Sequence, residues 1–331
     1  MGFTSINEVF EAFNNIKALI IGDVMVDAYD WGKVERISPE APVPIIHLTK
    51  RENRLGGAAN VALNIKALGA KPILVAAIGD DLDGDDFLKL MDDEGMDKTG
   101  IIRSQSRVTT TKRRVIAGSQ HILRIDNETD RPLDESDSHL LLAKIEQLIS
   151  EVNVVIFEDY DKGVISEKII AATVAWCEIK NIPIAVDPKK RNFLHYKGVT
   201  LFKPNLKELK EGLKVDFTPD SIVELANAVD QLHLKLGAKI YFITLSERGV
   251  YIQSLTEKHH IPAHLREISD VSGAGDTVIS TASLCLALGL SNHFLAELSN
   301  LSGGLVCEYV GVIPINKENL QKEAERLDLR L

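Results

Sequence analysis

Short apolar runs that end in polar residues recur along the whole 331-residue chain. Such runs are typical of strands that are buried on both faces of a parallel sheet. They occupy residues 17–23, 71–80, 153–159, 182–188, 199–205 and 238–246. Amphipathic segments typical of helices lie between them, as at residues 134–150, 166–180 and 219–236. The alternation predicts an α/β fold, in which a central, mostly parallel sheet carries helices on both faces.

The polar residues at the ends of these runs should lie close together. The carboxyl ends of parallel strands meet at one edge of a sheet, and ligands bind at that edge in folds of this kind. The residues expected there are Asp23, Asp27, Asp159, Asp187 and Asn205. The sequence therefore predicts a ligand site along this edge.

Two regions depart from the alternation. Residues 29–50 carry three prolines and alternating apolar positions, and residues 108–126 have the pattern of a hairpin that turns near Gly118. We expect both regions to form strands outside the main sheet, as a β-lid over the site. No low-complexity linker or internal repeat divides the sequence, so we expect residues 1–331 to form one domain with this lid.

Composition and charge narrow the range of partners. The formal net charge is -10 and the sequence has no long basic run, which disfavours nucleic acid as a partner. No segment has the pattern of a signal peptide or of a bilayer-spanning helix, so we expect a cytoplasmic protein without a membrane partner. The three cysteines are far apart in the sequence and show no CxxC pattern. We therefore expect them to be buried, reduced thiols.

The stretch GAGD, residues 273–276, carries the strongest chemical signal. Small residues at a helix start expose backbone N–H groups, which form an anion site together with the helix dipole. We interpret the N–H groups of Gly273, Ala274 and Gly275 as facing a transferring phosphoryl group. Asp276 would then act as a base toward an attacking hydroxyl. Taken alone, the stretch is equally well explained as a small-residue turn for tight helix packing.

The stretch LGGAAN, residues 55–60, and the nearby Asp27 each have two interpretations. Gly56 and Gly57 allow a backbone to approach a ligand, and Asn60 suits a hydrogen bond to a polyol. The same residues also suit close packing of a strand against a helix. Asp27 suits two neighbouring sugar hydroxyls or, alternatively, a turn or helix cap.

The familiar phosphate loops GxxxxGK[ST] and GxGxxG are absent, so a nucleotide would have to be held in another way. Asn205 and Glu208 are three residues apart at the start of a predicted helix, where both can face one ion and its waters. The alternative is an N-terminal capping pair.

The order of these motifs resembles that of the ribokinase-like (PfkB) carbohydrate kinases, with GGxxN early, NxxE in the middle and D-x-x-GAGD late. Five stretches are similar to the kinase domain of the bacterial D-glycero-D-manno-heptose 7-phosphate kinases: RISPEAPVPI, GGAANVALN, EDYDKG, VDPK and DVSGAGDTVI. The resemblance implies a three-layer sandwich that phosphorylates O1 of this heptose, using ATP and Mg²⁺, for ADP-heptose and lipopolysaccharide core synthesis. In many such proteins the domain is fused to an adenylyltransferase, whose HxGH signature is not seen here.

The same resemblance implies roles for individual residues. Asp276 is the catalytic base and residues 273–275 form the anion hole. The residues implied at ATP are Asn205, Glu208, Thr244, Ser246, Gly249 and Asn300. The residues implied at the sugar are Asp27, Gly56, Gly57, Asn60, Asp159 and Lys162. For metals, the resemblance implies Glu208 at Mg²⁺ and Asp270 at a monovalent cation such as K⁺.

A phosphorylated acceptor needs a cationic cradle, because ATP's own phosphates repel its dianion. Arg36, Arg113, Arg114 and Arg124 lie on the two lid segments. We expect some of them, with Arg36, Arg113 and Arg124 as the candidates, to bind the 7-phosphate. The alternative for each is a solvated arginine on an exposed strand.

Two further expectations concern the oligomeric state and the alternative functions. Strands with exposed edges favour pairing between subunits, so we expect a homodimer through the lid. The main alternative function is a related kinase for fructose 6-phosphate, ribose or a nucleoside. A non-catalytic sugar or nucleotide sensor is a further alternative, which the intact Asp276 and its anion turn disfavour.

Overall fold

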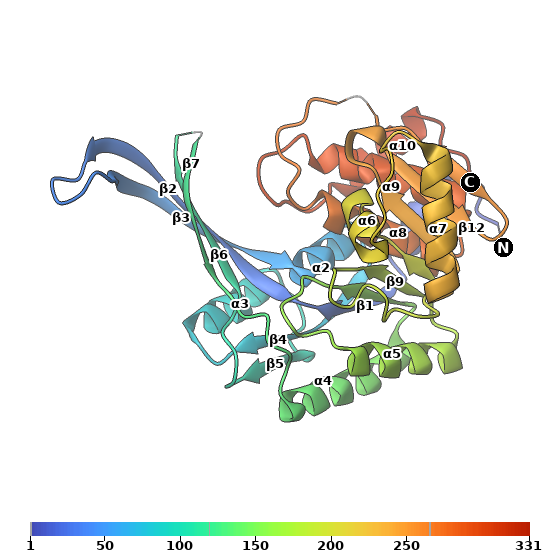
Figure 1. The fold of residues 1–331 in the computed structure, drawn as a ribbon, viewed down its shortest axis with the longest axis horizontal. Helices are drawn as coiled ribbons and strands as arrows, with labels where there is room; N and C mark the ends of the chain where they lie inside the picture. Colours follow the sequence, from blue (N-terminus) through green and yellow to red (C-terminus); the bar gives the residue numbers. More distant parts are fainter. Residues whose placement is uncertain (1, 119, 265) are drawn as a thin grey trace.

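The computed structural model describes residues 2–118, 120–264 and 266–331, which form a larger body and a narrower arm of strands (Figure 1). The larger of two sheets has the strand order β13-β12-β11-β10-β9-β8-β1-β4-β5. Neighbouring strands in this sheet run parallel, except at one edge, where β12 runs antiparallel to both β11 and β13. The strands are β1 (Lys17–Gly22), β4 (Lys71–Gly79), β5 (Ile101–Ser104), β8 (Val154–Glu158), β9 (Ile184–Asp187), β10 (Leu201–Phe202), β11 (Ile240–Thr244), β12 (Val250–Ser254) and β13 (Lys258–Ile261). The predicted mostly parallel sheet is confirmed.

Helices cover both faces of this sheet, as predicted. One face carries α1 (Ile6–Phe13), α2 (Ala58–Ala67), α3 (Leu82–Asp93), α8 (Ala274–Ala287), α9 (Asn292–Val306) and α10 (Lys317–Arg326). The other carries α4 (Glu135–Leu148), α5 (Glu167–Lys180), α6 (Leu206–Leu213) and α7 (Ile222–Leu236). Successive side chains of β8 alternate between the two cores: Val154 and Ile156 join one, and Val155 and Phe157 join the other. Each buried strand therefore stabilises two layers at once.

The second sheet consists of four strands in the order β3-β2-β6-β7, and we call it the small sheet. Its strands are β2 (Val24–Ile37), β3 (Pro44–Gly57), β6 (Thr111–Ala117) and β7 (Gln120–Asn127). Its β2 and β3 form the arm that projects farthest from the body (Figure 1). The strands expected at residues 29–50 and 108–126 are thus present. However, β2 begins at Val24, so Asp27 lies inside the small sheet and not at the end of β1.

The starts of two helices differ from the rest. Most helices have a Ser, Asp or Asn cap whose side chain accepts a backbone N–H, as Asp81 does for α3 and Ser166 for α5. By contrast, α2 and α8 begin at Gly57 and Gly273, and neither has a side-chain cap. The motifs GGAAN and GAGD, both singled out in the sequence, therefore lie at helix starts that no side chain caps.

The strand order reverses between β1 and β8, which is the point where ligands bind in open α/β sheets. Asp23 directly follows β1 and shapes the loop after β8. Its carboxylate accepts backbone N–H groups of Tyr160 (2.9 Å), Lys162 (3.0 Å) and Val164 (3.0 Å). This buried carboxylate thus holds the loop that lies beside the switch point.

Cys177, Cys285 and Cys307 are buried and form no disulfide among the described residues. Burial raises the pKa of the Cys177 thiol to about 12, as expected for an inert structural thiol. Across residues 2–118, 120–264 and 266–331, no helix is long and apolar enough to cross a membrane.

Gly57 allows the chain to pass from the small sheet into α2. Its φ of 60° and ψ of -136° favour glycine, and a Cβ there would lie 2.5 Å from the carbonyl oxygen of Asp23. We therefore expect Gly57→Ala to lower the free energy of unfolding by about 2–4 kcal/mol, measured by urea denaturation. Gly95→Ala is the control, because Gly95 has φ of 59° but open space around it. Equal losses in the two variants would contradict the steric constraint.

Candidate active site

Asp276 lies in the first turn of α8, and its side chain is buried. Its Oδ2 accepts a hydrogen bond from Nδ2 of Asn60 at 2.7 Å, and its Oδ1 accepts one from the hydroxyl of Tyr160 at 2.8 Å. The structure therefore brings together the motifs GGAAN and GAGD with the loop after β8. Tyr160 was not singled out in the sequence, although it lies in the stretch EDYDKG.

The environment of Asp276 suits a general base. Burial raises its pKa to about 6, although the hydrogen bonds from Asn60 and Tyr160 favour the charged form. A carboxylate with this pKa is largely ionised at neutral pH, yet it accepts a proton more readily than an exposed aspartate does. Burial and the charge of Asp276 raise the pKa of Tyr160 well above its usual value, so its hydroxyl remains a hydrogen-bond donor.

The turn before α8 presents backbone donors beside Asp276. The N–H of Ala274 donates to the carbonyl of Val271 at 3.3 Å, so this expected member of the anion hole is already engaged. For Gly273 and Gly275, no hydrogen-bond acceptor of the N–H lies among the described residues. Gly273 has φ of 80°, and a Cβ there would lie 3.1 Å from Nδ2 of Asn60. The turn therefore has the form of an anion hole with two free donors.

A cavity of about 530 Å³ opens beside this turn. Its wall includes residues 273–276 and most residues that were expected at a nucleotide, namely Asn205, Thr244, Ser246, Gly249 and Asn300. Residues that the sequence did not indicate also line it: Val250, Val271, Val278, Gly303 and Gly304. The cavity thus combines an apolar part with a polar end at Asp276, as small-molecule sites commonly do.

Asn205 and Glu208 form the capping pair that was one of their two interpretations. The Asn205 side chain accepts the N–H of Glu208 at 2.9 Å, and Oε2 of Glu208 accepts the N–H of Asn205 at 2.8 Å. The other carboxylate oxygen of Glu208 accepts a hydrogen bond from Nζ of Lys189 at 2.7 Å. Since Lys189 lines the cavity, Glu208 is connected to the cavity through this lysine.

Lys189 and Lys203, which were not assigned a role from the sequence, meet Asp187, which was expected at this edge of the sheet, at the wall of the cavity. Nζ of Lys203 lies 2.7 Å from Oδ2 of Asp187, and Nζ of Lys189 lies 3.4 Å from Oδ1. Burial alone would raise the pKa of Asp187, but the two ammonium groups outweigh it and hold this pKa below its usual value. Lys189 is also paired with Glu208, so the charges of these four groups balance, and the two ammonium groups are the donors at this end of the cavity that suit phosphate oxygens.

Glu158 and Asp159 point in opposite directions, because successive residues of a strand do so. Asp159 is buried and accepts hydrogen bonds from Asn192 (2.9 Å) and the hydroxyl of Tyr196 (2.8 Å), so it is not brought to Asp276. Glu158 is buried on the side of Asp276, and neither carboxylate oxygen has a partner among the described residues. Burial next to Asp187 and Asp276 raises the pKa of Glu158 well above its usual value. Because the two acidic residues are adjacent in the sequence, only the register of β8 determines which of them lies on the side of Asp276.

Asp27 lies in the small sheet beside the glycines of β3. It is buried, and its Oδ1 accepts a hydrogen bond from Nη1 of Arg114 at 2.6 Å. A Cβ on Gly56 would lie 2.2 Å from Oδ2 of Asp27, so glycine is required for this carboxylate to fit. Gly56 and Asp27 thus form one unit at the base of the small sheet.

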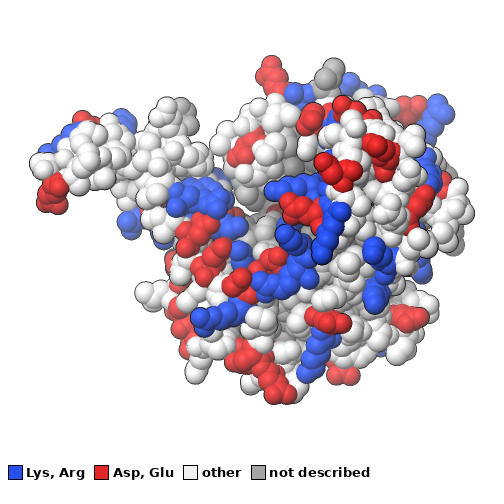
Figure 2. All heavy atoms as spheres, viewed as in Figure 1, with Lys and Arg blue, Asp and Glu red and all other residues white. Residues whose placement is uncertain are grey.

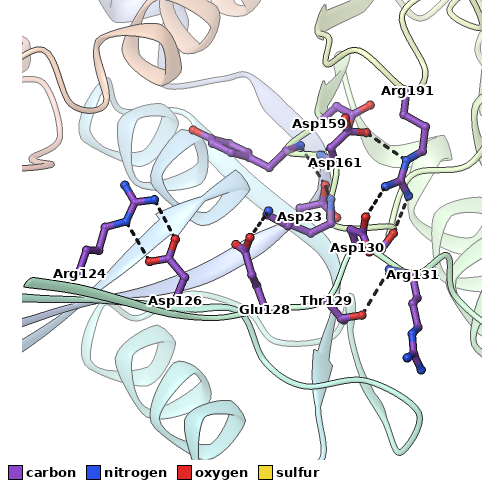
Figure 3. A network of polar contacts seen from close by, with 12 residues as sticks. Asp23, Arg124, Asp126, Glu128, Thr129, Asp130, Arg131, Asp159, Asp161 and Arg191 are labelled. Atoms are coloured by element: carbon purple, nitrogen blue, oxygen red, sulfur yellow. Dashed lines mark hydrogen bonds and ion pairs between the residues drawn. The ribbon is translucent and has the colours of Figure 1, made fainter.

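The three arginines expected at an acceptor phosphate lie apart from one another. Arg36 is exposed near the β2–β3 turn, at the far end of the arm (Figure 1). Arg113 pairs with Asp30 at 3.2 Å and lines a hollow beside α3, on the other face from Arg114. Arg124 is exposed, and Figure 3 shows it paired with Asp126 on the same strand. The structure therefore does not gather them into one cradle.

Asp270 and Lys162 complete the expected set. Asp270 accepts hydrogen bonds from Ser272 and from the N–H of Gly311 at 2.9 Å. Burial opposes ionisation there, but these hydrogen bonds outweigh it and lower the pKa of Asp270. Nζ of Lys162 lies 2.7 Å from Oε1 of Glu128. Figure 2 shows lysine and arginine side chains gathered where the arm meets the body.

Comparison with known proteins agrees with this geometry. Residues 15–319 match the model of the pfkB family carbohydrate kinases. The protein named bifunctional protein HldE from Methylobacillus flagellatus is 39% identical over 308 residues, which cover 93% of this chain and 63% of that protein. The protein of the same name from Caulobacter sp. is 40% identical over 311 residues, with coverages of 93% and 63%. The chain thus spans less than two thirds of the length of these relatives.

Solved structures share the fold at low sequence identity. Phosphofructokinase-2 from Escherichia coli in complex with fructose-6-phosphate has a TM-score of 0.77 at 17% identity, covering 95% of this chain and 99% of that one. Arabidopsis thaliana ribokinase complexed with ribose and ATP has a TM-score of 0.71 at 16% identity, with coverages of 93% and 99%. The chain belongs to the pfkB family of carbohydrate kinases, enzymes that transfer a phosphoryl group to a sugar hydroxyl.

Proposed function

We propose that this kinase transfers the γ-phosphoryl group of ATP to O1 of D-glycero-D-manno-heptose 7-phosphate, for ADP-heptose and lipopolysaccharide core synthesis. The stretch RISPEAPVPI and its four companions support this acceptor, as do relatives at 35–40% identity that share the name HldE. The observation that carries the kinase mechanism is the buried Asp276, which lies between the cavity and the small sheet.

In this mechanism Asp276 takes the proton of the acceptor hydroxyl as the hydroxyl attacks the γ-phosphorus. Asn60 and Tyr160 hold the carboxylate in one orientation through hydrogen bonds to its two oxygens. The free N–H groups of Gly273 and Gly275 stabilise the charge that develops on the phosphoryl oxygens. Positioning and charge stabilisation account for most of the catalysis in phosphoryl transfer.

Lys189 and Lys203 would neutralise the phosphate groups at the polar end of the cavity. Residues 2–118, 120–264 and 266–331 contain no group of three or more His, Cys, Asp or Glu placed to hold a metal ion. Mg²⁺ commonly takes one or two carboxylates, with phosphates and waters for the rest. The buried, unpartnered Glu158 and the nearby Asp187 suit that requirement, and Glu208 lies behind Lys189. Bound there, Mg²⁺ would supply charge neutralisation at the phosphates.

Three further parts of the proposal concern the surroundings of the reaction. The small sheet acts as a lid that excludes water. It leaves apolar side chains exposed, which supports pairing with a second copy as a homodimer: Val34, Ile37, Val43, Leu123 and Ile125. The loop of Asp270 would bind K⁺, and the protein would work in the cytoplasm with sugar phosphate and ATP as its small-molecule partners.

A panel of acceptors tests the proposed substrate. Purified protein with ATP and Mg²⁺ is given heptose 7-phosphate, fructose 6-phosphate, ribose or adenosine, and products are identified by phosphorus NMR. We expect turnover of the heptose and a new anomeric phosphate resonance. Turnover confined to another acceptor would contradict the heptose assignment and retain the mechanism. Binding without any turnover would favour the sensor.

Replacement of Asp276 tests the base. We expect Asp276→Asn to lower kcat by a factor on the order of 10²–10⁴ with little change in either KM, because the amide keeps the size of the side chain and cannot take the proton. Asp92→Asn, on an exposed part of α3, is the control. Turnover close to that of the unmodified protein would remove Asp276 from this role.

The hydrogen bond from Tyr160 predicts a shift in the pH profile. Because Asp276 must be ionised to act, kcat/KM should fall as the pH drops through about 6, the pKa of this carboxylate. Tyr160→Phe removes a donor that favours the charged form, so the pKa of Asp276 rises and the acid limb moves to higher pH. Tyr309→Phe, at an exposed position, should leave the limb in place. A shift to lower pH in Tyr160→Phe would contradict this assignment.

A further inference from the structure

Strand β6 of the small sheet presents basic residues to two different sides. Lys112 and Arg114 are two residues apart and share a face, whereas Arg113 lies on the other. In register, Lys112 lies opposite Asp27 on β2 and opposite Asp126 on β7. The face that carries Lys112 is therefore the one that carries Asp27, which we call the inner face.

The cations near this face differ in whether a carboxylate forms an ion pair with them. Arg114 pairs with Asp27 at 2.6 Å, Arg124 with Asp126 at 2.8 Å and Lys162 with Glu128 at 2.7 Å. Figure 3 shows Asp126 of β7 beside Arg124, and Glu128, just past the end of β7, on the same side of the backbone. Nζ of Lys112 has no carboxylate within 4.0 Å among the described residues. Lys112 is thus a half-buried cation whose charge is not matched by an ion pair.

The position of Lys112 connects it to the catalytic base. Its Nζ lies 5.7 Å from the centre of the Tyr160 ring, and Nζ of Lys189 lies 5.6 Å from the same centre. The hydroxyl of this tyrosine donates to Asp276. Lys189 lines the cavity beside Asp276, whereas Lys112 comes from the small sheet. One aromatic ring therefore contacts a cation of the cavity and a cation of the inner face.

The surroundings of Lys112 disfavour its positive charge. Burial lowers the pKa of Lys112, and the carboxylates of Asp27 and Glu128 offset this only in part. The neighbouring Lys162 lowers it further, since two ammonium groups repel each other. An anion bound between the two lysines would remove both penalties. Lys162 also lines an open hollow of about 850 Å³, whose wall does not include Lys112.

We propose that Lys112, assisted by Lys162, binds the phosphate group that the acceptor already carries, and so makes this kinase select phosphorylated over unphosphorylated sugars. The proposal rests on the proposed function in one respect, namely that the acceptor binds on the inner face beside Asp276. It assigns the phosphate to two lysines in place of the lid arginines. Arg36 is exposed at the far end of the arm and Arg113 lies on the other face, whereas Arg124, like Lys162, is paired with a carboxylate. Lys112 is therefore placed as the main ligand, because its ammonium group has no carboxylate within 4.0 Å among the described residues.

Equilibrium binding tests the assignment separately from turnover. Dissociation constants are measured by calorimetry, with Mg²⁺ and a non-hydrolysable ATP analogue present. The probes are heptose 7-phosphate with the free heptose, and fructose 6-phosphate with fructose. We expect at least one phosphorylated sugar to bind the unmodified protein about 10- to 100-fold more tightly than its free counterpart, as charge-assisted hydrogen bonds provide. Lys112→Met should remove most of this preference and leave the affinity for the nucleotide analogue unchanged.

Two variants control for effects on folding and on general charge. Arg51→Met removes a cation from the outer face of the small sheet and should keep the full preference. Lys112→Arg keeps the charge and should restore at least part of the preference. Circular dichroism checks that each variant is folded, and Lys112→Gln replaces Lys112→Met if the latter is not.

The outcomes separate this inference from the proposed function. An unmodified protein that does not prefer phosphorylated sugars would overturn the inference, as would a Lys112→Met variant that keeps the preference. If fructose 6-phosphate shows the Lys112-dependent preference and the heptose is not phosphorylated, the proposed substrate fails and the phosphate site stands. If the heptose is phosphorylated and Lys112→Met has no effect, the function stands and the phosphate site fails.

Discussion

The burial of one carboxylate, Asp276, is the constraint on which the site depends. A buried carboxylate is stable only with hydrogen-bond donors, and its two donors, Asn60 and Tyr160, come from positions 216 and 116 residues away in the sequence. Each donor can reach it only if α2, α8 and the loop after β8 meet at one point. The carboxyl ends of β1 and β8 supply that point, because Asp23 between β1 and β2 holds the loop that carries Tyr160.

The carboxylates around this point differ in charge state because their neighbours differ. Asp187 has two ammonium groups within 3.4 Å and a lowered pKa, whereas Glu158 has no hydrogen-bond partner in the described part of the chain and a raised pKa. Asp276 lies between these extremes, with two neutral donors and a pKa of about 6. Acid and base roles are separated in this way in many active sites.

The sequence predicted the sheet, the helices and the smaller group of strands because each depends on local periodicity. It also indicated part of the cavity wall, since short motifs such as GAGD place small residues at a helix start. It indicated Asp159, which the structure turns away from Asp276, and not the adjacent Glu158, because neighbouring strand residues are distinguished only by which face the register assigns to them. Tyr160, Lys189 and Lys203 were missed because their roles arise from contacts between distant segments.

The small sheet and the loop before α8 are linked by contacts that make them behave as one unit. Arg54 of β3 donates to the carbonyl of Val312 at 3.2 Å and lies over the ring of Tyr29, and Gly311 donates to Asp270. Asp270 precedes the anion turn by only a few residues. A tilt of the small sheet would therefore move the inner face and strain the turn at the same time. If the small sheet acts as the proposed lid, these contacts would couple its closure over the acceptor to the alignment of the phosphoryl-binding N–H groups.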